Sequence, residues 1–187
     1  MEVVQYEKKH HDSWEEFVNS SSNGTIFHSR KFLSYHSPDK FTDNSLLFFD
    51  EGRLTAVFPA ADIKRDGLKV LWSHMGASYG GLVHAENLSI KQSFDLTQSL
   101  IDYALREKFE KIVSTSVPVV YQKRYNQYLD FAFVKNGFQY QKREVTSVIT
   151  LDVDEDNVMK LIKPESRTSV RKAEKLGVVI KKSNDFD

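Results

Sequence analysis

The sequence contains no cysteine, which excludes a disulfide framework, a thiolate zinc site and a cysteine nucleophile. It also lacks an apolar N-terminal segment and any run of about 18 apolar residues, so we expect no signal peptide and no membrane span. Together these absences predict a cytoplasmic protein. An excess of one charge is missing too, because 26 Lys and Arg balance 26 Asp and Glu. We therefore expect any electrostatic function to be local rather than a general affinity for nucleic acid or membrane.

Glycine is sparse as well, yet three of the eight glycines lie within residues 73–82, SHMGASYGGL. Glycine permits positive φ and leaves backbone N–H groups uncovered. The spacing matches neither the dinucleotide fingerprint nor a Walker loop. Two interpretations remain: a sharp turn or bulge between strands, or a backbone that passes close to a ligand.

The apolar pattern predicts an α+β fold with a mixed, largely antiparallel sheet. Apolar runs at 46–49 and 54–58 flank a turn signal and predict a hairpin that is covered on both faces. Helical spacing predicts long helices over 88–109 and 121–135 on the faces of the sheet, and an alternating pattern predicts a strand over 138–151. We expect the aromatic residues of 121–135 to pack in the core rather than to stack on bases.

His28, Arg30 and His36 lie close together in the sequence, just before the predicted hairpin. A histidine in such a place is either a structural or surface residue or a group that binds a ligand. We assign no metal site.

A cationic stripe follows a change in composition after Leu151. Residues 152–156 are acidic, and residues 164–177 form a predicted helix with an early proline and a closing glycine. Arg167, Arg171 and Lys175 fall at i, i+4 and i+8 with Lys172 beside them, which suits an anionic phosphate or carboxylate. The alternative is a solvated cationic face. Nucleic-acid binding is disfavoured, since this short helix is the only basic feature.

Three segments carry a resemblance to a known family: GTIFHS at 24–29, GASYGGL at 76–82 and RTSVRKAEKLGV at 167–178. They resemble the FemAB-type acyltransferases, tandem GNAT-like proteins that include peptidoglycan-bridge aminoacyltransferases and related acetyltransferases. The resemblance runs over essentially the whole chain. It implies a first GNAT-like module at 1–150 and the truncated start of a second at 151–187.

The resemblance implies an N-acyltransferase that moves an acetyl or aminoacyl group to an amine of a cell-envelope sugar or peptide precursor. The donor would be acetyl-CoA or aminoacyl-tRNA, and this fragment is expected to bind none and to be inactive. Members of the family share no single general base, so no catalytic residue is assigned. The alternative is a non-catalytic or regulatory module that binds a glycan or peptide. The oligomeric state is left open.

The same resemblance, with the patterns above, gives two sets of candidate residues. The substrate-binding set lines a cleft with Tyr79 as a side wall and comprises His28, Arg30, Ser78, Tyr79, Gly80 and Gly81. The anion-binding set comprises Arg167, Arg171, Lys172 and Lys175. One departure concerns the acceptor: members acting on peptidoglycan precursors tend to carry Trp and a following Lys in the helix after the first loop, where this chain has FLSYH at 32–36.

Overall fold

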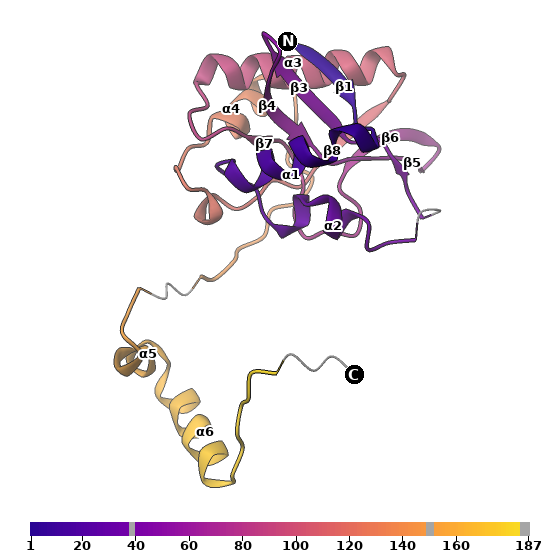
Figure 1. Cartoon of the computed structure of the whole chain (residues 1–187). Helices are drawn as coiled ribbons and strands as arrows, with labels where there is room; N and C mark the ends of the chain where they lie inside the picture. Colours follow the sequence, from indigo (N-terminus) through magenta and orange to yellow (C-terminus); the bar gives the residue numbers. More distant parts are fainter. Residues whose placement is uncertain (38–39, 149–151, 184–187) are drawn as a thin grey trace. The chain divides into compact units, whose positions relative to one another are not determined.

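A computed structural model describes residues 1–37, 40–148 and 152–183 (Figure 1). The chain divides into two compact units, Met1–Tyr140 and Gln141–Asp187, which are described separately. In the described part of the first unit, short 3-10 helices at Lys8–His10, Ile26–His28 and Val119–Tyr121 accompany twelve strands and α-helices. These are β1 (Glu2–Gln5), α1 (His11–Ser20), α2 (Arg30–Leu33), β2 (Thr42–Asp43), β3 (Leu46–Asp50), β4 (Arg53–Phe58), β5 (Ala61–Arg65), β6 (Leu68–Ser73), β7 (Val83–His84), α3 (Ile90–Arg106), β8 (Lys111–Ser114) and α4 (Tyr128–Lys135).

The strands form two four-stranded sheets, in the orders β1-β3-β4-β7 and β2-β5-β6-β8. The recorded pairings are antiparallel except that of β6 with β8, which is parallel and aligns Ser73 with Ser114. The chain passes between the sheets at β2–β3 and β4–β5, where the Asn44 N–H donates to the Ala60 carbonyl at 2.8 Å. The prediction of a mixed, largely antiparallel α+β fold is confirmed, with the difference that the strands divide between two sheets.

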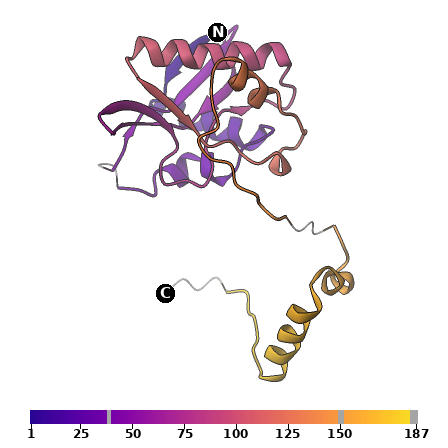
Figure 2. The same ribbon diagram turned by 180° about the vertical axis from the view of Figure 1, so that it is seen from behind.

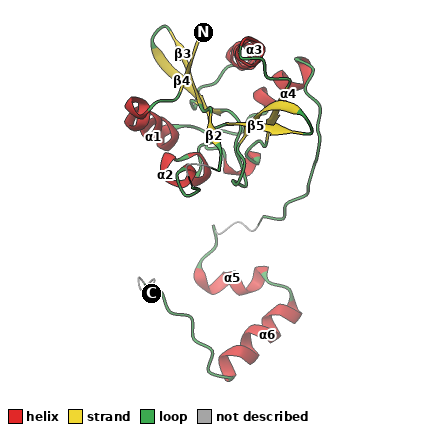
Figure 3. Cartoon of the chain, turned by 90° about the vertical axis from the view of Figure 1, so that its right-hand side faces the viewer, coloured by secondary structure: helices red, strands yellow, loops and turns green. Residues whose placement is uncertain are grey.

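The β1-β3-β4-β7 sheet is buried on both faces because successive side chains of a strand point in opposite directions. Leu46 and Phe48 of β3 enter one core with α3 and α4, whereas Leu47 enters a second core with Trp14 of α1. Figure 3 shows α1 and α3 on opposite sides of β3 and β4. The hairpin is therefore covered on both faces, as its continuous apolar runs predicted.

The two helices α3 and α4 share one face instead of covering opposite faces. Figures 1 and 2 show α3 running along one side of the strands with α4 beside it. The rings of Phe94 on α3 and Phe131 on α4 lie 6.0 Å apart, edge to face. The other face is covered by α1, whose short apolar stripe of Trp14 and Val18 is almost fully buried.

The helix predicted over 121–135 begins only at Tyr128. The Asn126 N–H donates to Gln122 Oε1 at 3.0 Å, and the Tyr128 N–H donates to Asn126 Oδ1 at 3.2 Å. Side-chain amides that bond the backbone in this way compete with helix formation. The core prediction for the aromatic residues was wrong for four of the five: Phe133 is buried, and the others are 41% to 71% exposed, namely Tyr121, Tyr125, Tyr128 and Phe131.

The strand predicted over 138–151 is not formed in its described part, residues 138–148; residues 149–151 lie outside the described chain. The side chains of 139–148 are exposed. An alternating sequence becomes a strand only where a neighbouring edge supplies hydrogen bonds, and none of the recorded strand pairs includes these residues. The strand prediction was therefore wrong for residues 138–148.

The second unit contains α5 (Glu155–Leu161) and α6 (Pro164–Lys175). Pro164 opens α6, and Gly177, with φ +77°, follows its end, as the sequence predicted. That this unit starts a second GNAT-like module stays a prediction. None of the helices in the described residues of either unit is long and apolar enough to cross a membrane.

Candidate functional site

The glycine loop, residues 73–82, lies at one edge of the β2-β5-β6-β8 sheet. Because β6 and β8 are parallel, their carboxyl ends at Ser73 and Ser114 meet there. The Gly80 N–H donates to the Thr115 carbonyl at 2.9 Å, and the Gly81 N–H donates to Ser73 Oγ at 2.7 Å. These bonds fold the loop back over the ends of β6 and β8.

Among the glycines of this loop, Gly80 approaches backbone atoms most closely. A Cβ placed on it would lie 2.5 Å from the carbonyl carbon and 2.6 Å from the carbonyl oxygen of Ser73, closer than real side chains come. Both N–H groups at Gly80 and Gly81 are already paired inside the fold, and both residues are buried. A substrate-binding role for their backbone stays a prediction, and it would require these bonds to open.

His28 anchors the glycine loop from the opposite side. Its Nδ1 accepts from the Thr25 N–H at 3.0 Å, so Nε2 carries the proton and donates to the Gly80 carbonyl at 3.1 Å. Burial lowers the pKa of His28 below 6.5, although both backbone bonds oppose that shift. The structure therefore brings His28 and Gly80 together, as two members of the predicted substrate-binding set, in a buried structural contact.

Arg30 is engaged within the fold. Its Nη2 pairs with Asp43, its Nη1 donates to Ser45 Oγ at 3.1 Å, and its guanidinium lies 3.7 Å from the centre of the Tyr6 ring. The side chain is 13% exposed. An ion pair, a hydrogen bond and a stacked ring together fix the arginine in one position, which leaves little of it to meet a substrate.

Tyr79 belongs to an aromatic row, which we define as Phe32, Phe27, Tyr79 and Tyr121. Successive ring centres along the row are 5.0, 5.5 and 5.8 Å apart. Desolvation, and after it the neighbouring Tyr121 hydroxyl, raise the pKa of Tyr79 above 10, so its phenol is neutral near pH 7. Tyr121 is half exposed, Ser78 beside Tyr79 is exposed, and the other three rings of the row are partly exposed, so the row reaches the surface.

A second aromatic group lies against Gly76. The Phe41 ring is 5.1 Å from that of His36 and 5.7 Å from that of His74. A side chain on Gly76 would overlap the His36 imidazole, whose Nε2 is buried and has no partner among the described residues. Burial lowers the pKa of His74, and nearby Arg30 and His36 act in the same direction. The loop is thus packed between two aromatic groups.

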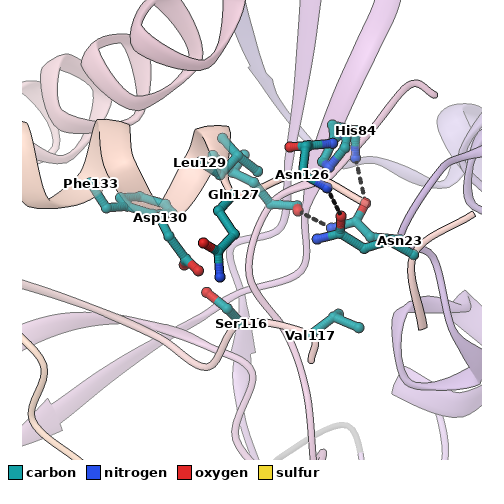
Figure 4. A pocket seen from close by; sticks show the side chains of 11 residues that line it. Asn23, His84, Ser116, Val117, Asn126, Gln127, Leu129, Asp130 and Phe133 are labelled. Carbon is teal, nitrogen blue, oxygen red and sulfur yellow. Dashed lines mark hydrogen bonds between the residues drawn. The ribbon is translucent and has the colours of Figure 1, made fainter. Parts of the chain in front are cut away.

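A polar pocket adjoins the loop where β7, the segment after β8 and α4 meet (Figure 4). Its volume of about 30 Å³ holds one or two water molecules. Figure 4 shows the polar ends of Ser116, Gln127 and Asp130 turned toward one another. The pocket is lined by Asn23, Leu82, His84, Ser116, Val117, Gln122, Asn126, Gln127, Leu129, Asp130 and Phe133.

Asn23 fixes one wall of the polar pocket. Its Nδ2 donates to the Leu82 carbonyl at 2.8 Å, and its Oδ1 accepts from the His84 N–H at 2.9 Å. Sequence reasoning missed this residue, because the stretch SSSNG at 20–24 is typical of a polar loop. Its partners are some 60 residues away in the chain, so no local signal marks it as buried.

His84 lines the same pocket and is 1% exposed. Its Nδ1 lies 2.8 Å from the Ala85 carbonyl and must be the donor, which leaves a lone pair on Nε2. Burial lowers the pKa of His84 below 6.5, more than this bond raises it. The ring is therefore neutral near pH 7, with Nε2 as a hydrogen-bond acceptor.

The cationic stripe, Arg167, Arg171, Lys172 and Lys175, lies on α6 of the second unit. Arg167 is half-buried and the other three are exposed. Within residues 152–183, none of the four takes part in an ion pair. Anion binding by the stripe stays a prediction. Across the described ranges, the structure contains no group of three or more His, Asp or Glu side chains placed to hold a metal ion.

No family model matches this chain, and no curated protein sequence matches it significantly. Its fold, however, is similar to that of solved structures. FemX superposes on 98% of this chain with a TM-score of 0.64 and 20% identity, and the chain spans 46% of the FemX chain. A ribosomal-protein-alanine N-acetyltransferase from Brucella melitensis biovar Abortus 2308 superposes on 79% of this chain and 98% of its own, with a TM-score of 0.51 and 12% identity. This chain therefore has the FemAB-like, GNAT-type fold that the sequence resemblance predicted.

Proposed function

We propose that this chain is the acceptor-binding part of a cytoplasmic N-acyltransferase of FemAB/GNAT type. It would serve the transfer of an acetyl or aminoacyl group to an amine of a cell-envelope sugar or peptide precursor. The observation that carries the proposal is the similarity of fold to FemX over 98% of the chain. The acceptor class comes from the resemblance of the sequence segments at 24–29, 76–82 and 167–178 to FemAB-type enzymes.

The surface around the glycine loop supports an acceptor role. We expect a sugar or peptide to pack against the partly exposed rings of the aromatic row. The polar pocket follows the row directly, since Gln122 of the pocket is the residue after Tyr121 of the row. Small cavities with a few convergent polar groups beside apolar surface are typical of sites that fix one end of a ligand.

The donor is expected to bind elsewhere. The two cavities described have volumes of about 30 and 130 Å³, whereas pockets for whole ligands typically measure roughly 300–1,000 Å³. We therefore expect the 187-residue chain to bind acetyl-CoA more weakly than micromolar, an affinity that corresponds to about 8 kcal/mol. Calorimetric titration of the chain with acetyl-CoA measures this directly.

The test of function uses the full reading frame that contains this chain. The protein is incubated with radiolabelled acetyl-CoA or aminoacyl-tRNA and with UDP-linked amino sugars or UDP-linked muramyl peptides. We expect label on the acceptor amine, located by mass spectrometry. Acceptors whose amine is blocked by prior acetylation serve as the matched control and should take up none.

Absence of transfer from either donor would contradict the proposal. If calorimetry nevertheless detects binding of the precursors, the glycan- or peptide-binding module is the correct alternative. If neither transfer nor binding is observed, both hypotheses are wrong for these acceptors.

A further inference from the structure

A second cavity, which we call the edge cavity, lies between the first turns of α3 and the end of β4 and has a volume of about 130 Å³. Its lining shares no residue with the glycine loop or the polar pocket. It forms where β7 leaves β4: the Ala85 N–H still donates to the Thr55 carbonyl at 3.3 Å, and the chain then turns toward α3. Figures 1 and 3 show α3 beside the β3–β4 hairpin and the N-terminus.

The interior of the edge cavity is apolar. Leu96 of α3 is 1% exposed, and Leu88, just before that helix, is half-buried against the same hydrophobic core. Leu54, Ala85 and Met1 complete the apolar lining. A cavity of about 150 Å³ with leucine-type walls binds benzene, so a volume of about 130 Å³ suits a hydrocarbon group of roughly five carbon atoms.

The rim of the edge cavity carries hydrogen-bond donors and one positive charge. Arg53 is exposed, and its guanidinium takes part in no hydrogen bond, ion pair or ring contact with the described residues. Asp50 lies opposite it in the β3–β4 register, and no ion pair joins the two. Gln92 Oε1 accepts from the Ser89 N–H at 2.9 Å, which leaves the Nε2 amide group to donate. None of the nine lining residues is aspartate or glutamate, so the rim favours an anion.

We propose that the edge cavity binds a small aliphatic monocarboxylate. The hydrocarbon tail lies against Leu88 and Leu96, and the carboxylate lies at the rim, where it accepts hydrogen bonds from Arg53 and the Gln92 amide. The volume of the interior excludes long-chain acids. Binding at this site needs neither an acyl donor nor an acceptor amine, so it is testable apart from the proposed function.

The test titrates sodium isovalerate into the 187-residue chain and follows the methyl signals of Leu88 and Leu96 by NMR. We expect saturable shifts of both, with a dissociation constant in the millimolar range. The methyl signals of Val70 on β6 are the internal control, because this side chain is buried and lines neither cavity.

Two related compounds separate the contribution of the tail from that of the charge. Acetate keeps the carboxylate but lacks the branched tail, and the burial of each carbon group is worth roughly fourfold in affinity. We therefore expect acetate to bind at least roughly tenfold more weakly than isovalerate. Isovaleramide keeps the tail but has no charge, and it should bind roughly three- to fivefold more weakly.

Replacing the arginine tests its contact with the carboxylate directly. Arg53→Gln should weaken isovalerate binding roughly three- to fivefold and leave isovaleramide binding unchanged. Arg124→Gln is the matched control and should change neither, since Arg124 is also exposed and lines neither cavity. Melting temperatures verify that both variants are folded.

The proposal is overturned if the Leu88 and Leu96 signals do not saturate, or if acetate or isovaleramide binds as tightly as isovalerate. These measurements on the unchanged chain decide the matter even if Arg53→Gln does not fold. Acyl transfer without isovalerate binding would refute this site alone. Isovalerate binding without acyl transfer would refute the proposed function alone.

Discussion

Replacing Gly80 with alanine tests whether the glycine loop is held by contacts inside the fold. The added Cβ would lie 2.5 Å from the carbonyl carbon of Ser73 and 2.6 Å from its oxygen. These are backbone atoms of β6, which is paired with β5 on one side and with β8 on the other. The clash is therefore relieved only by moving residue 80 away from the strand.

That movement breaks two hydrogen bonds of the Gly80 backbone. They are the donation to Thr115 at 2.9 Å and the bond accepted from His28 at 3.1 Å. Each is worth about 1 kcal/mol, and overpacking a buried position costs roughly 1–3 kcal/mol more. We expect Gly80→Ala to lower the free energy of unfolding by about 2–5 kcal/mol, and Gly80→Val to lower it further.

Urea unfolding followed by tryptophan fluorescence measures this change, because Trp14 and Trp72 both lie in the first unit. Gly67→Ala is the matched control. Gly67 has φ +82° and open space around its Cβ position, so alanine there should cost only about 1 kcal/mol. A cost at Gly80 no larger than at Gly67, with an unchanged urea m-value, would refute the packing role of the loop.

Three further outcomes are expected. Burial lowers the pKa of His28, His74 and His84, so below about pH 6.5 the unfolded chain binds more protons than the folded one. The free energy of unfolding is therefore highest above that pH and falls on acidification, by at most about 1.4 kcal/mol per pH unit for each histidine. Urea unfolding midpoints at pH 7 and pH 5 measure this fall. Asn23→Ala leaves the Leu82 carbonyl and the His84 N–H without their side-chain partner. It should lower the free energy of unfolding by about 2–4 kcal/mol in the same assay; a loss under about 1 kcal/mol would contradict the role of Asn23 in the pocket wall. Arg171 is exposed and takes part in no ion pair within residues 152–183. Arg171→Ala should change the free energy of unfolding by no more than about 0.5 kcal/mol while reducing acyl transfer by the full reading frame; a large fall in melting temperature would instead make the residue structural.

Local patterns predicted those elements whose partners lie nearby in the sequence. The hairpin of β3 and β4 needs only its own turn and two apolar runs, and α6 needs only a proline and a glycine. The same reasoning failed where a competing or missing partner decided the outcome. The side-chain amides of Gln122 and Asn126 bond to the backbone, so the helix predicted over 121–135 begins only at Tyr128. Residues 138–148 belong to none of the recorded strand pairs.

The structure brings some of the candidate residues together, and their role in binding a substrate stays a prediction. The hydrogen bond between His28 and Gly80, the neighbour of Tyr79, joins residues that are far apart in the chain. Asn23 and His84, which line the polar pocket, carried no local signal at all. Each depends on bonds between segments about 60 residues apart, and a single sequence does not display such pairings.

The same long-range bonds explain why stability and binding are difficult to separate at the glycine loop. Gly80 is tied to His28 on one side and to Thr115 on the other. The residue before this pair of glycines, Tyr79, supplies a ring of the aromatic row, and the residue after it, Leu82, lines the polar pocket. A shift of the backbone at Gly80 therefore displaces both surfaces together. Loss of activity in a Gly80 variant is therefore uninformative about substrate contact. A substitution at Tyr79 that leaves the backbone in place is the sharper test of whether the aromatic row contacts an acceptor.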